Sequence, residues 1–202
     1  MEAHVRLTAD SVFVTSHDGK TDRLGGRMKV ANFPLDSLRT ERYTQTRDSA
    51  GYSGSTICTI EEFLDICAAN RVRPLLHLKT LSKNTKECGF LTALVNLIDR
   101  KGLSDSCIIL TSEPDYIDYL MARHPKIKLQ YQADAKWREM FDWSSARNLD
   151  VQIRADLVDA ECIRRYHDKG LRVNVWTVNS KADYDRLRDM GVDYMVTDYL
   201  MP

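Results

Sequence analysis

The sequence predicts an α/β fold, a TIM-type (β/α) barrel that is incomplete and lacks its first βα unit. Short apolar or β-branched runs alternate with amphipathic helical patterns from residue 59 to the end of the chain, as expected for parallel strands covered by helices. No glycine-rich phosphate fingerprint opens any of these helices, which disfavours the alternative, an open doubly wound sheet. We count about seven barrel strands, and a closed barrel needs eight.

The first eighteen residues predict two short strands. Alternation of side chains along a strand puts Glu2 and His4 on one face of the first strand. The second run, Val12 to Ser16, is β-branched and aromatic. His17 and Asp18 follow this strand directly, and strand ends are where α/β folds carry their catalytic residues. We therefore expect a carboxylate and imidazoles to converge near this strand end.

The rest of the chain predicts one long loop and then a regular series of elements. Residues 19–58 are polar and broken by glycines, and they predict the loop. Thr59 and Glu62 form a capping box that starts the first helix. Further helices are predicted over 87–100, 114–123, 136–143, 159–169 and 181–190, with strands over 73–78, 107–110, 127–131, 151–153, 172–177 and 194–197.

Composition predicts a single globular domain over residues 1–202 in the cytoplasm. The chain is 43% hydrophobic, and its 29 basic residues balance 29 acidic ones, so no overall charge favours a nucleic-acid partner. No apolar run approaches the ~20 residues of a membrane span, so we expect no stable membrane insertion. The five cysteines are scattered without a CxxC pair, which indicates reduced thiols rather than disulfides or a zinc ribbon.

Three stretches carry a resemblance to a known family. They read EAHVRLTADSVFVTSHDGKTDR, TIEEFLDICAANRVRPLLHLK and GLRVNVWTVNSKADYDRLRDMGVDYMVTDYL. Together they resemble the glycerophosphodiester phosphodiesterase family, whose members are (β/α) barrels. The first resembles the family's Glu-x-Asp strand and His-Asp pair, the second its Glu-x-Lys unit, and the third its terminal Trp-Thr-Val-Asn and Thr-Asp unit.

The resemblance implies an enzyme that hydrolyses glycerophosphodiesters to an alcohol and glycerol 3-phosphate in lipid metabolism. It implies that Glu2 is a metal ligand, that His17 is a catalytic acid/base and that Lys79, as catalytic residue, contacts the substrate phosphate. Trp176 would form part of the wall near the substrate. By the same resemblance the cofactor is a divalent metal, Mg or Ca, and the partner is a small glycerophosphodiester or phosphate ligand.

The chain also departs from the family pattern at several positions. It has no strand with the family's His-Arg pair, so the first catalytic histidine is missing. His4 stands where the pattern has an acidic metal ligand, and so does His77. A carboxylate with two imidazoles suits Zn or Mn better than Mg or Ca. The alternative is that metal binding has been lost, leaving a catalytically impaired relative that binds a phosphate-containing ligand or a partner.

Simpler structural roles compete with each functional assignment. His17 would otherwise be a strand-end histidine bonded to its loop, Lys79 a solvated lysine and Trp176 a core residue. Basic residues that could contact phosphate are Arg6, Arg23, Arg27 and Lys29, although charges scattered through a polar segment are usually solvated. A barrel that lacks one strand has two unpaired edges, so we expect a homodimer, or an edge covered by the long loop.

Overall fold

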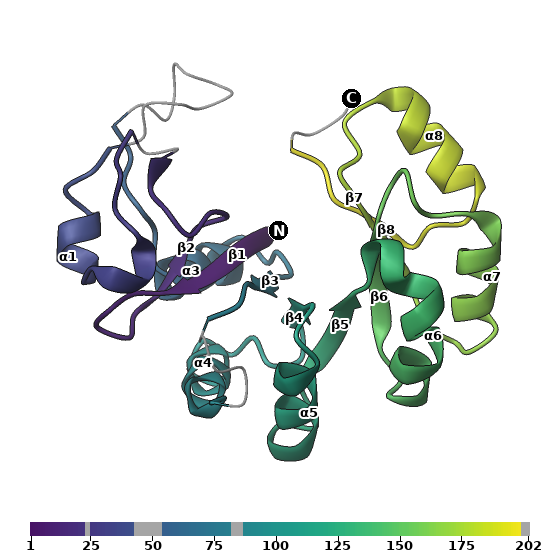
Figure 1. The fold of residues 1–202 in the computed structure, drawn as a ribbon, viewed down its shortest axis with the longest axis horizontal. Coiled ribbons are helices and arrows are strands. Elements are labelled where there is room, and N and C mark those ends of the chain that lie inside the picture. Colours follow the sequence, from purple (N-terminus) through teal and green to yellow (C-terminus); the bar gives the residue numbers. More distant parts are fainter. Residues whose placement is uncertain (23–24, 43–53, 82–86, 199–202) are drawn as a thin grey trace. The chain divides into compact units, whose positions relative to one another are not determined.

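The computed structural model describes residues 1–22, 25–42, 54–81 and 87–198. The chain divides into two compact units. The first comprises Met1–Ile109 with Glu113–Lys128, and the second comprises Leu110–Ser112 with Leu129–Pro202. Each unit combines strands with helices that follow them in the chain (Figure 1).

The first unit is built on strands in the order β2-β1-β3-β4. Strand β1 (Glu2–Leu7) pairs antiparallel with β2 (Phe13–Thr15) and parallel with β3 (Leu75–Leu78). Strand β4 (Ile108–Thr111) begins in this unit and ends in the second. The register of β1 on β3 fixes where the polar side chains of these two strands meet.

The helices of the first unit follow the predicted pattern from residue 59 onward. They are α3 (Ile60–Ala69), α4 (Gly89–Arg100) and α5 (Pro114–Arg123). The segment predicted as a long loop contains two short helices in its described part, η2 (Val30–Asn32) and α1 (Leu35–Leu38). Both helices pack on a small core of their own, because the buried side chains of Val14, Val30, Leu38 and Ile57 form one cluster. Residues 43–53 of the predicted loop lie outside the described residues.

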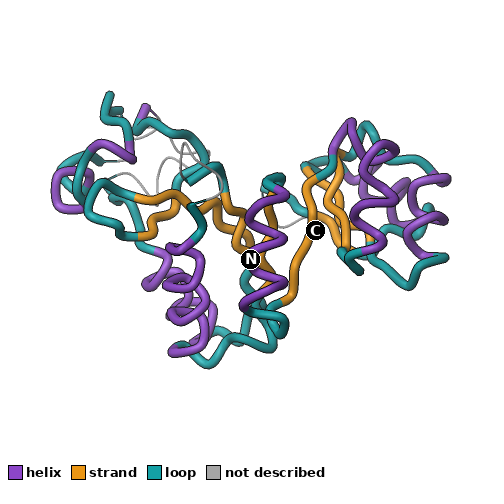
Figure 2. The backbone as a smooth tube through the Cα atoms, turned by 60° about the horizontal axis from the view of Figure 1, so that its bottom comes forward, coloured by secondary structure: helices purple, strands orange, loops and turns teal. Residues whose placement is uncertain are grey.

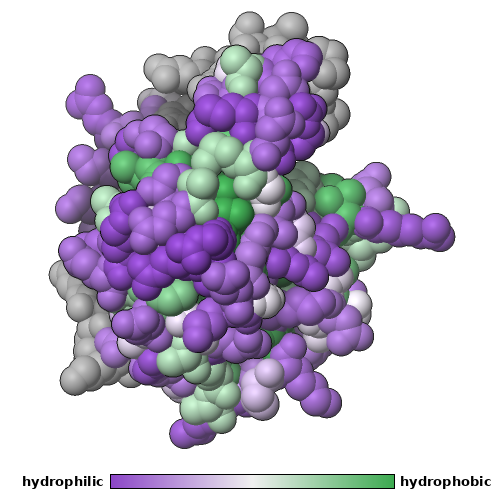
Figure 3. Space-filling view, turned by 90° about the vertical axis from the view of Figure 1, so that its right-hand side faces the viewer, coloured by the Kyte–Doolittle hydropathy of each residue, from purple (hydrophilic) through white to green (hydrophobic). Residues whose placement is uncertain are grey.

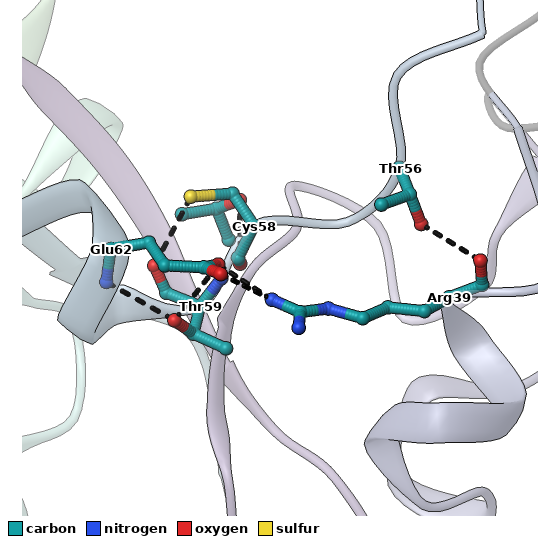
Figure 4. A network of polar contacts seen from close by, with 6 residues as sticks. Arg39, Thr56, Cys58, Thr59 and Glu62 are labelled. Carbon is teal, nitrogen blue, oxygen red and sulfur yellow. Dashed lines mark hydrogen bonds and ion pairs between the residues drawn. The ribbon is translucent and has the colours of Figure 1, made fainter.

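The predicted capping box at the start of α3 is present (Figure 4). The hydroxyl of Thr59 accepts a hydrogen bond from the Glu62 amide at 3.1 Å, and the Glu62 carboxylate accepts one from the Thr59 amide at 2.8 Å. Arg39, which follows α1, donates to the same carboxylate at 2.6 and 2.7 Å. The Arg39 carbonyl in turn accepts from the Thr56 hydroxyl at 3.3 Å. One carboxylate thus caps a helix and anchors the segment that precedes it.

The second unit contains the end of β4 and then β5 to β8 in chain order. Its strands are β5 (Lys128–Gln132), β6 (Asp150–Arg154), β7 (Val173–Trp176) and β8 (Tyr194–Met195), and the pairs β5–β6, β6–β7 and β7–β8 are parallel. Its helices are η3 (Asp134–Lys136), α6 (Trp137–Ala146), α7 (Ala160–His167) and α8 (Lys181–Asp189). Figure 2 shows these helices (purple) beside the strands (orange) that they connect.

Three amide side chains are buried on neighbouring strands of the second unit, and we call them the amide layer: Gln130, Gln152 and Asn174. Their exposed fractions are 1%, 1% and 3%. The Asn174 amide nitrogen donates to the Gln130 side-chain oxygen at 3.2 Å. The Gln152 amide nitrogen and the Asn174 side-chain oxygen are buried without a partner among the described residues. The interior of this unit is therefore partly polar, although the residues that alternate with the amide layer are apolar.

The surface drawn in Figure 3 is mostly hydrophilic, and hydrophobic residues appear on it in small patches. In the described residues, helices are too short or too polar to cross a membrane.

Candidate active site

Strands β1 and β3 bring the predicted metal ligands together. Residues two apart on a strand share a face, so Glu2 and His4 project together from β1. His4 is the register partner of His77 on β3. The parallel pairing therefore gathers three residues that are 75 positions apart in sequence at their extremes.

The three side chains form a compact cluster with two imidazoles around one carboxylate oxygen. Oε1 of Glu2 lies 3.5 Å from Nε2 of His4 and 3.3 Å from Nδ1 of His77. One donor atom from each residue lies within 4.8 Å of the other two. Oε2 of Glu2 is buried and has no hydrogen-bond partner among the described residues. The cluster thus has a carboxylate oxygen that is free to bind a metal ion.

His17 follows β2 and reaches the same cluster. Its ring packs edge-on against the ring of His4 with 4.5 Å between centroids. Nδ1 of His17 is hydrogen-bonded to Oδ1 of Asp18 at 2.8 Å, which fixes the orientation of the ring. The amide of Ser16 donates to the His4 carbonyl at 2.9 Å and ties this segment to β1. The structure thus brings His17 and the Glu2–His4–His77 cluster together, as the strand patterns predict.

The electrostatics of the cluster keep His4 neutral. Burial is the largest cause of a lowered pKa at His4, and together with the neighbouring basic groups of His77, Lys79, His17 and Arg6 it brings that pKa to about 3. A neutral imidazole is the form that binds a metal ion. His4 is therefore ready to act as a ligand at neutral pH without first losing a proton.

Lys79 lies just beyond the end of β3, and its amide donates to the Val5 carbonyl at 3.3 Å. It is two residues from His77, so both side chains leave the strand from one face. Its charge contributes to the low pKa of His4. Lys79 is thus electrostatically coupled to the cluster, as a phosphate-binding residue would need to be.

The donor set of the cluster matches a borderline metal better than a hard one. Magnesium and calcium prefer six or more oxygen ligands, whereas two imidazoles and a carboxylate suit zinc, iron, manganese or nickel. The buried, unpartnered Oε2 of Glu2 offers the remaining carboxylate oxygen. Glu2, His4 and His77 are therefore the residues that could hold a divalent metal ion.

Trp176, the predicted substrate wall, belongs to the second unit. Its indole nitrogen donates to Oδ1 of Asp134 at 3.1 Å. Trp176 lines a hollow of about 250 Å³ with the charged residues Arg154, Asp156 and Arg186 among others. Sequence reasoning did not single out these charged residues. The one feature of the sequence that could have indicated them is that Arg154, like Trp176, lies at the end of a predicted parallel strand.

Comparison with known proteins establishes the family. The model of the glycerophosphoryl diester phosphodiesterase family matches residues 1–201. The chain belongs to this family. A glycerophosphodiester phosphodiesterase of Caldanaerobacter subterraneus subsp. tengcongensis is 24% identical over 204 residues, which are 98% of this chain and 81% of the relative.

Solved structures of the glycerophosphodiester phosphodiesterase family share the fold. A phosphodiesterase of Oleispira antarctica, solved with the product sn-glycerol-3-phosphate, matches with a TM-score of 0.83 and 20% identity over 98% of this chain and 80% of that chain. A glycerophosphodiester phosphodiesterase of Parabacteroides distasonis matches with a TM-score of 0.79 and 20% identity over 98% of this chain and 78% of that chain. The predicted fold class, an incomplete (β/α) barrel, is confirmed.

Proposed function

We propose that this member of the glycerophosphodiester phosphodiesterase family hydrolyses glycerophosphodiesters to an alcohol and glycerol 3-phosphate, with a divalent metal at the Glu2–His4–His77 cluster. The observation that carries the proposal is the meeting of this cluster with His17 at neighbouring strands of one unit. A set of metal-ligating side chains could hold the ion that stabilises charge on the phosphoryl group, and the imidazole beside it could act as general acid or base. Phosphodiester hydrolysis needs both functions.

His17 is proposed as the acid/base. Hydrolysis requires a proton at the oxygen of the departing alcohol, and histidine is the side chain that most often acts as a general acid. The hydrogen bond from Nδ1 to Asp18 supports this role, because it holds one ring nitrogen and directs Nε2 away from Asp18. The partly exposed position of His17 leaves it within reach of a ligand.

Lys79 is proposed to bind the phosphate of the substrate. The ammonium group of Lys79 would offset negative charge on the phosphoryl oxygens, which grows toward the transition state. Its electrostatic effect on His4 supports a position near the metal-type cluster. A role of Trp176 in the substrate wall stays a prediction from the family resemblance; within the second unit its indole nitrogen donates to Asp134.

The metal is proposed to be Zn or Mn rather than the Mg or Ca that the family resemblance implies. When bound, it would polarise the phosphoryl group and lower the pKa of a bound water. The two imidazole ligands from His4 and His77 support Zn or Mn. Only Glu2 provides the oxygen ligands that Mg and Ca prefer.

A single domain in a reducing compartment is also proposed. The family match runs through both units and supports one domain over residues 1–202. The five cysteines are free thiols, which supports a reducing compartment such as the cytoplasm.

The test is release of glycerol 3-phosphate from glycerophosphocholine by the purified chain with Mg, Ca, Mn or Zn added singly. We expect turnover above buffer, greatest with Mn or Zn. His17→Asn should lower kcat by at least about 100-fold, in the range of a lost general acid. The matched control is His124→Asn, since His124 bonds Thr92 at 3.0 Å on the helices α4 and α5.

Absence of product with every metal would contradict hydrolysis by this chain. If glycerol 3-phosphate then still bound and Lys79→Ala abolished its binding, the chain would be a non-catalytic ligand-binding relative.

A further inference from the structure

Arg6 is the third polar residue on the face of β1 that carries the cluster. It lies two residues beyond His4 and four beyond Glu2, and the alternating burial of β1 puts all three on one side of the strand. Val5 is the register partner of Leu78, so Arg6 is level with Lys79. Arg6, near the end of β1, and Lys79, just after β3, are thus two cationic residues that follow the histidines of the cluster.

The guanidinium of Arg6 is held at one point and unsatisfied at another. Its Nη2 donates to the His17 carbonyl at 2.9 Å. Its Nη1 lies 3.7 Å from the position that a Cβ on Gly19 would take, so the group rests against the Gly19 backbone. Its Nε is buried and has no partner among the described residues.

A buried unpaired donor on a charged group is costly. Leaving such a group without a partner costs several times the net value of a typical hydrogen bond. Native structures retain such atoms where a ligand, ion or water completes them. The position favours an anion that would pair with the guanidinium.

The surroundings of Arg6 select a phosphoryl group as that anion. Arg6 lies two residues after His4 on β1, and Lys79 lies two residues after His77, the register partner of His4 on β3, so the two cations lie beside the Glu2–His4–His77 cluster. A guanidinium donates from Nε and one Nη in parallel, which matches two oxygens of a phosphate. Other basic residues of this stretch differ: Arg27 and Lys29 are exposed, and Arg23 lies outside the described residues.

We propose that Arg6 is a second phosphate-binding residue beside Lys79, with its guanidinium donating to a phosphoryl oxygen of the ligand. The substrate class in this inference rests on the proposed function. The hydrogen bond from Arg6 to the His17 carbonyl would then hold the acid/base segment at a fixed place relative to the bound phosphate.

The test is calorimetric binding of sn-glycerol 3-phosphate and of inorganic phosphate to the full chain. Arg6→Gln should weaken both ligands by at least about tenfold, the value of one charge-assisted hydrogen bond. Arg6→Lys keeps the charge but loses the planar set of guanidinium donors. Its affinity for both ligands should lie between that of Arg6→Gln and that of the unaltered chain. The matched control is Arg73→Gln, because Arg73 is exposed and precedes β3 at the opposite end of the strand.

Binding without turnover separates this inference from the proposed function. If the chain does not hydrolyse glycerophosphodiesters but Arg6→Gln still weakens phosphate binding, the proposed function fails and the inference stands. Unchanged phosphate affinity in a folded Arg6→Gln variant would overturn the inference. A fall in kcat with unchanged affinity would instead make Arg6 a positioning residue for His17.

Discussion

Two imidazoles determine which metal the site would prefer. His4 and His77 take positions where the family pattern has acidic ligands, and both converge on one oxygen of Glu2. Nitrogen ligands favour borderline metals, and oxygen ligands favour magnesium and calcium. Metal preference at this site should therefore depend on residue identity at these two positions.

We expect His4→Asp with His77→Glu to reverse the metal preference. The double variant presents three carboxylates, so its affinity for Zn should fall and its affinity for Mg should rise, each by about tenfold or more. Calorimetric titration with each metal measures this directly without turnover. His124→Asn is the control and should bind metal as the unaltered chain does. Equal Zn affinity in the double variant and the unaltered chain would contradict the ligand assignment.

The low pKa of His4 predicts that acid destabilises the metal-free protein. The pKa of His4 is about 3 in the folded chain and the ordinary value is 6.5, so this contribution to stability is fully present above pH 6.5. It is lost as pH falls toward 3, because the unfolded chain binds a proton that the folded chain excludes. The free energy of unfolding should drop by about 2 kcal/mol between pH 6.5 and 5 from this group.

Urea unfolding in the presence of a chelator measures this effect. His4→Asn should have a shallower loss of stability over the same pH range. Parallel curves for both proteins would show that His4 does not carry the effect.

The raised pKa of Asp150 predicts the opposite pH dependence of stability. Burial raises the pKa of Asp150, so its contribution is present below the ordinary value and is lost as pH rises through the folded pKa. Its Oδ1 accepts from the Arg172 amide at 2.8 Å, and an asparagine oxygen can do the same. We expect Asp150→Asn to match or exceed the unaltered chain in thermal stability at pH 7. A loss above about 1 kcal/mol, the net value of a hydrogen bond, would contradict this.

The sequence predicted the ligand cluster because strand alternation and the family pattern both involve the same positions. Glu2 and His4 share a face by spacing alone, and His77 is placed by its unit of the pattern. The sequence alone could not distinguish Arg6 from the other basic residues near it as a proposed phosphate ligand. The burial of Arg6 and its hydrogen bond to the His17 carbonyl depend on the pairing of β1 with β2. That pairing is set by tertiary structure.

Among the elements, the start of α3 depends on one shared carboxylate. Glu62 caps the helix through the Thr59 amide and binds Arg39 from the preceding segment. Backbone hydrogen bonding at Thr59 and the charge of Arg39 both lower the pKa of Glu62, so the carboxylate is ionised at neutral pH.

We expect Glu62→Ala to lower stability by about 1 to 2 kcal/mol, the cost of a lost cap with a partly exposed ion pair. Thr59→Ala should cost about 1 kcal/mol, because it removes the cap and leaves the ion pair. Ser145→Ala on α6 is the control, since its hydroxyl makes only a long bond of 3.4 Å. Chemical unfolding of the three variants measures the difference. Equal stability of Glu62→Ala and the control would show that the shared carboxylate contributes nothing.

Element types were predictable, and element ends were less so. Every helix and strand predicted beyond residue 58 is present, with ends that differ by at most three residues. The two short helices before it were missed, because η2 and α1 each span only three or four residues. Their stability comes from burying Val30 and Leu38 with residues of β2 and of the segment before α3, which no local pattern indicates.

At the scale of the whole molecule, regular βα alternation was sufficient to predict the fold class. The homodimer that the incomplete barrel suggests stays a prediction. Strand β8 comes last in the order of strands and pairs with β7. Its two residues are only partly buried, so this edge is a place where another chain could pair.

We expect a homodimer in solution. Sedimentation at micromolar concentration should give twice the 23.2 kDa mass of the chain. Met195→Lys places a charge on the edge strand and should shift the protein to monomer, whereas Tyr184→Lys on α8 should not. A monomeric unaltered chain would contradict dimerisation through an open strand edge.

The Glu2–His4–His77 cluster has a consequence for protein engineering. All three side chains come from two adjacent strands whose parallel register is fixed by backbone hydrogen bonds. The geometry of the donor atoms is therefore defined by a single ladder and three positions. Such a motif is portable: any other parallel strand pair of equal register, with space above the same face, is a scaffold onto which the triad could be transplanted.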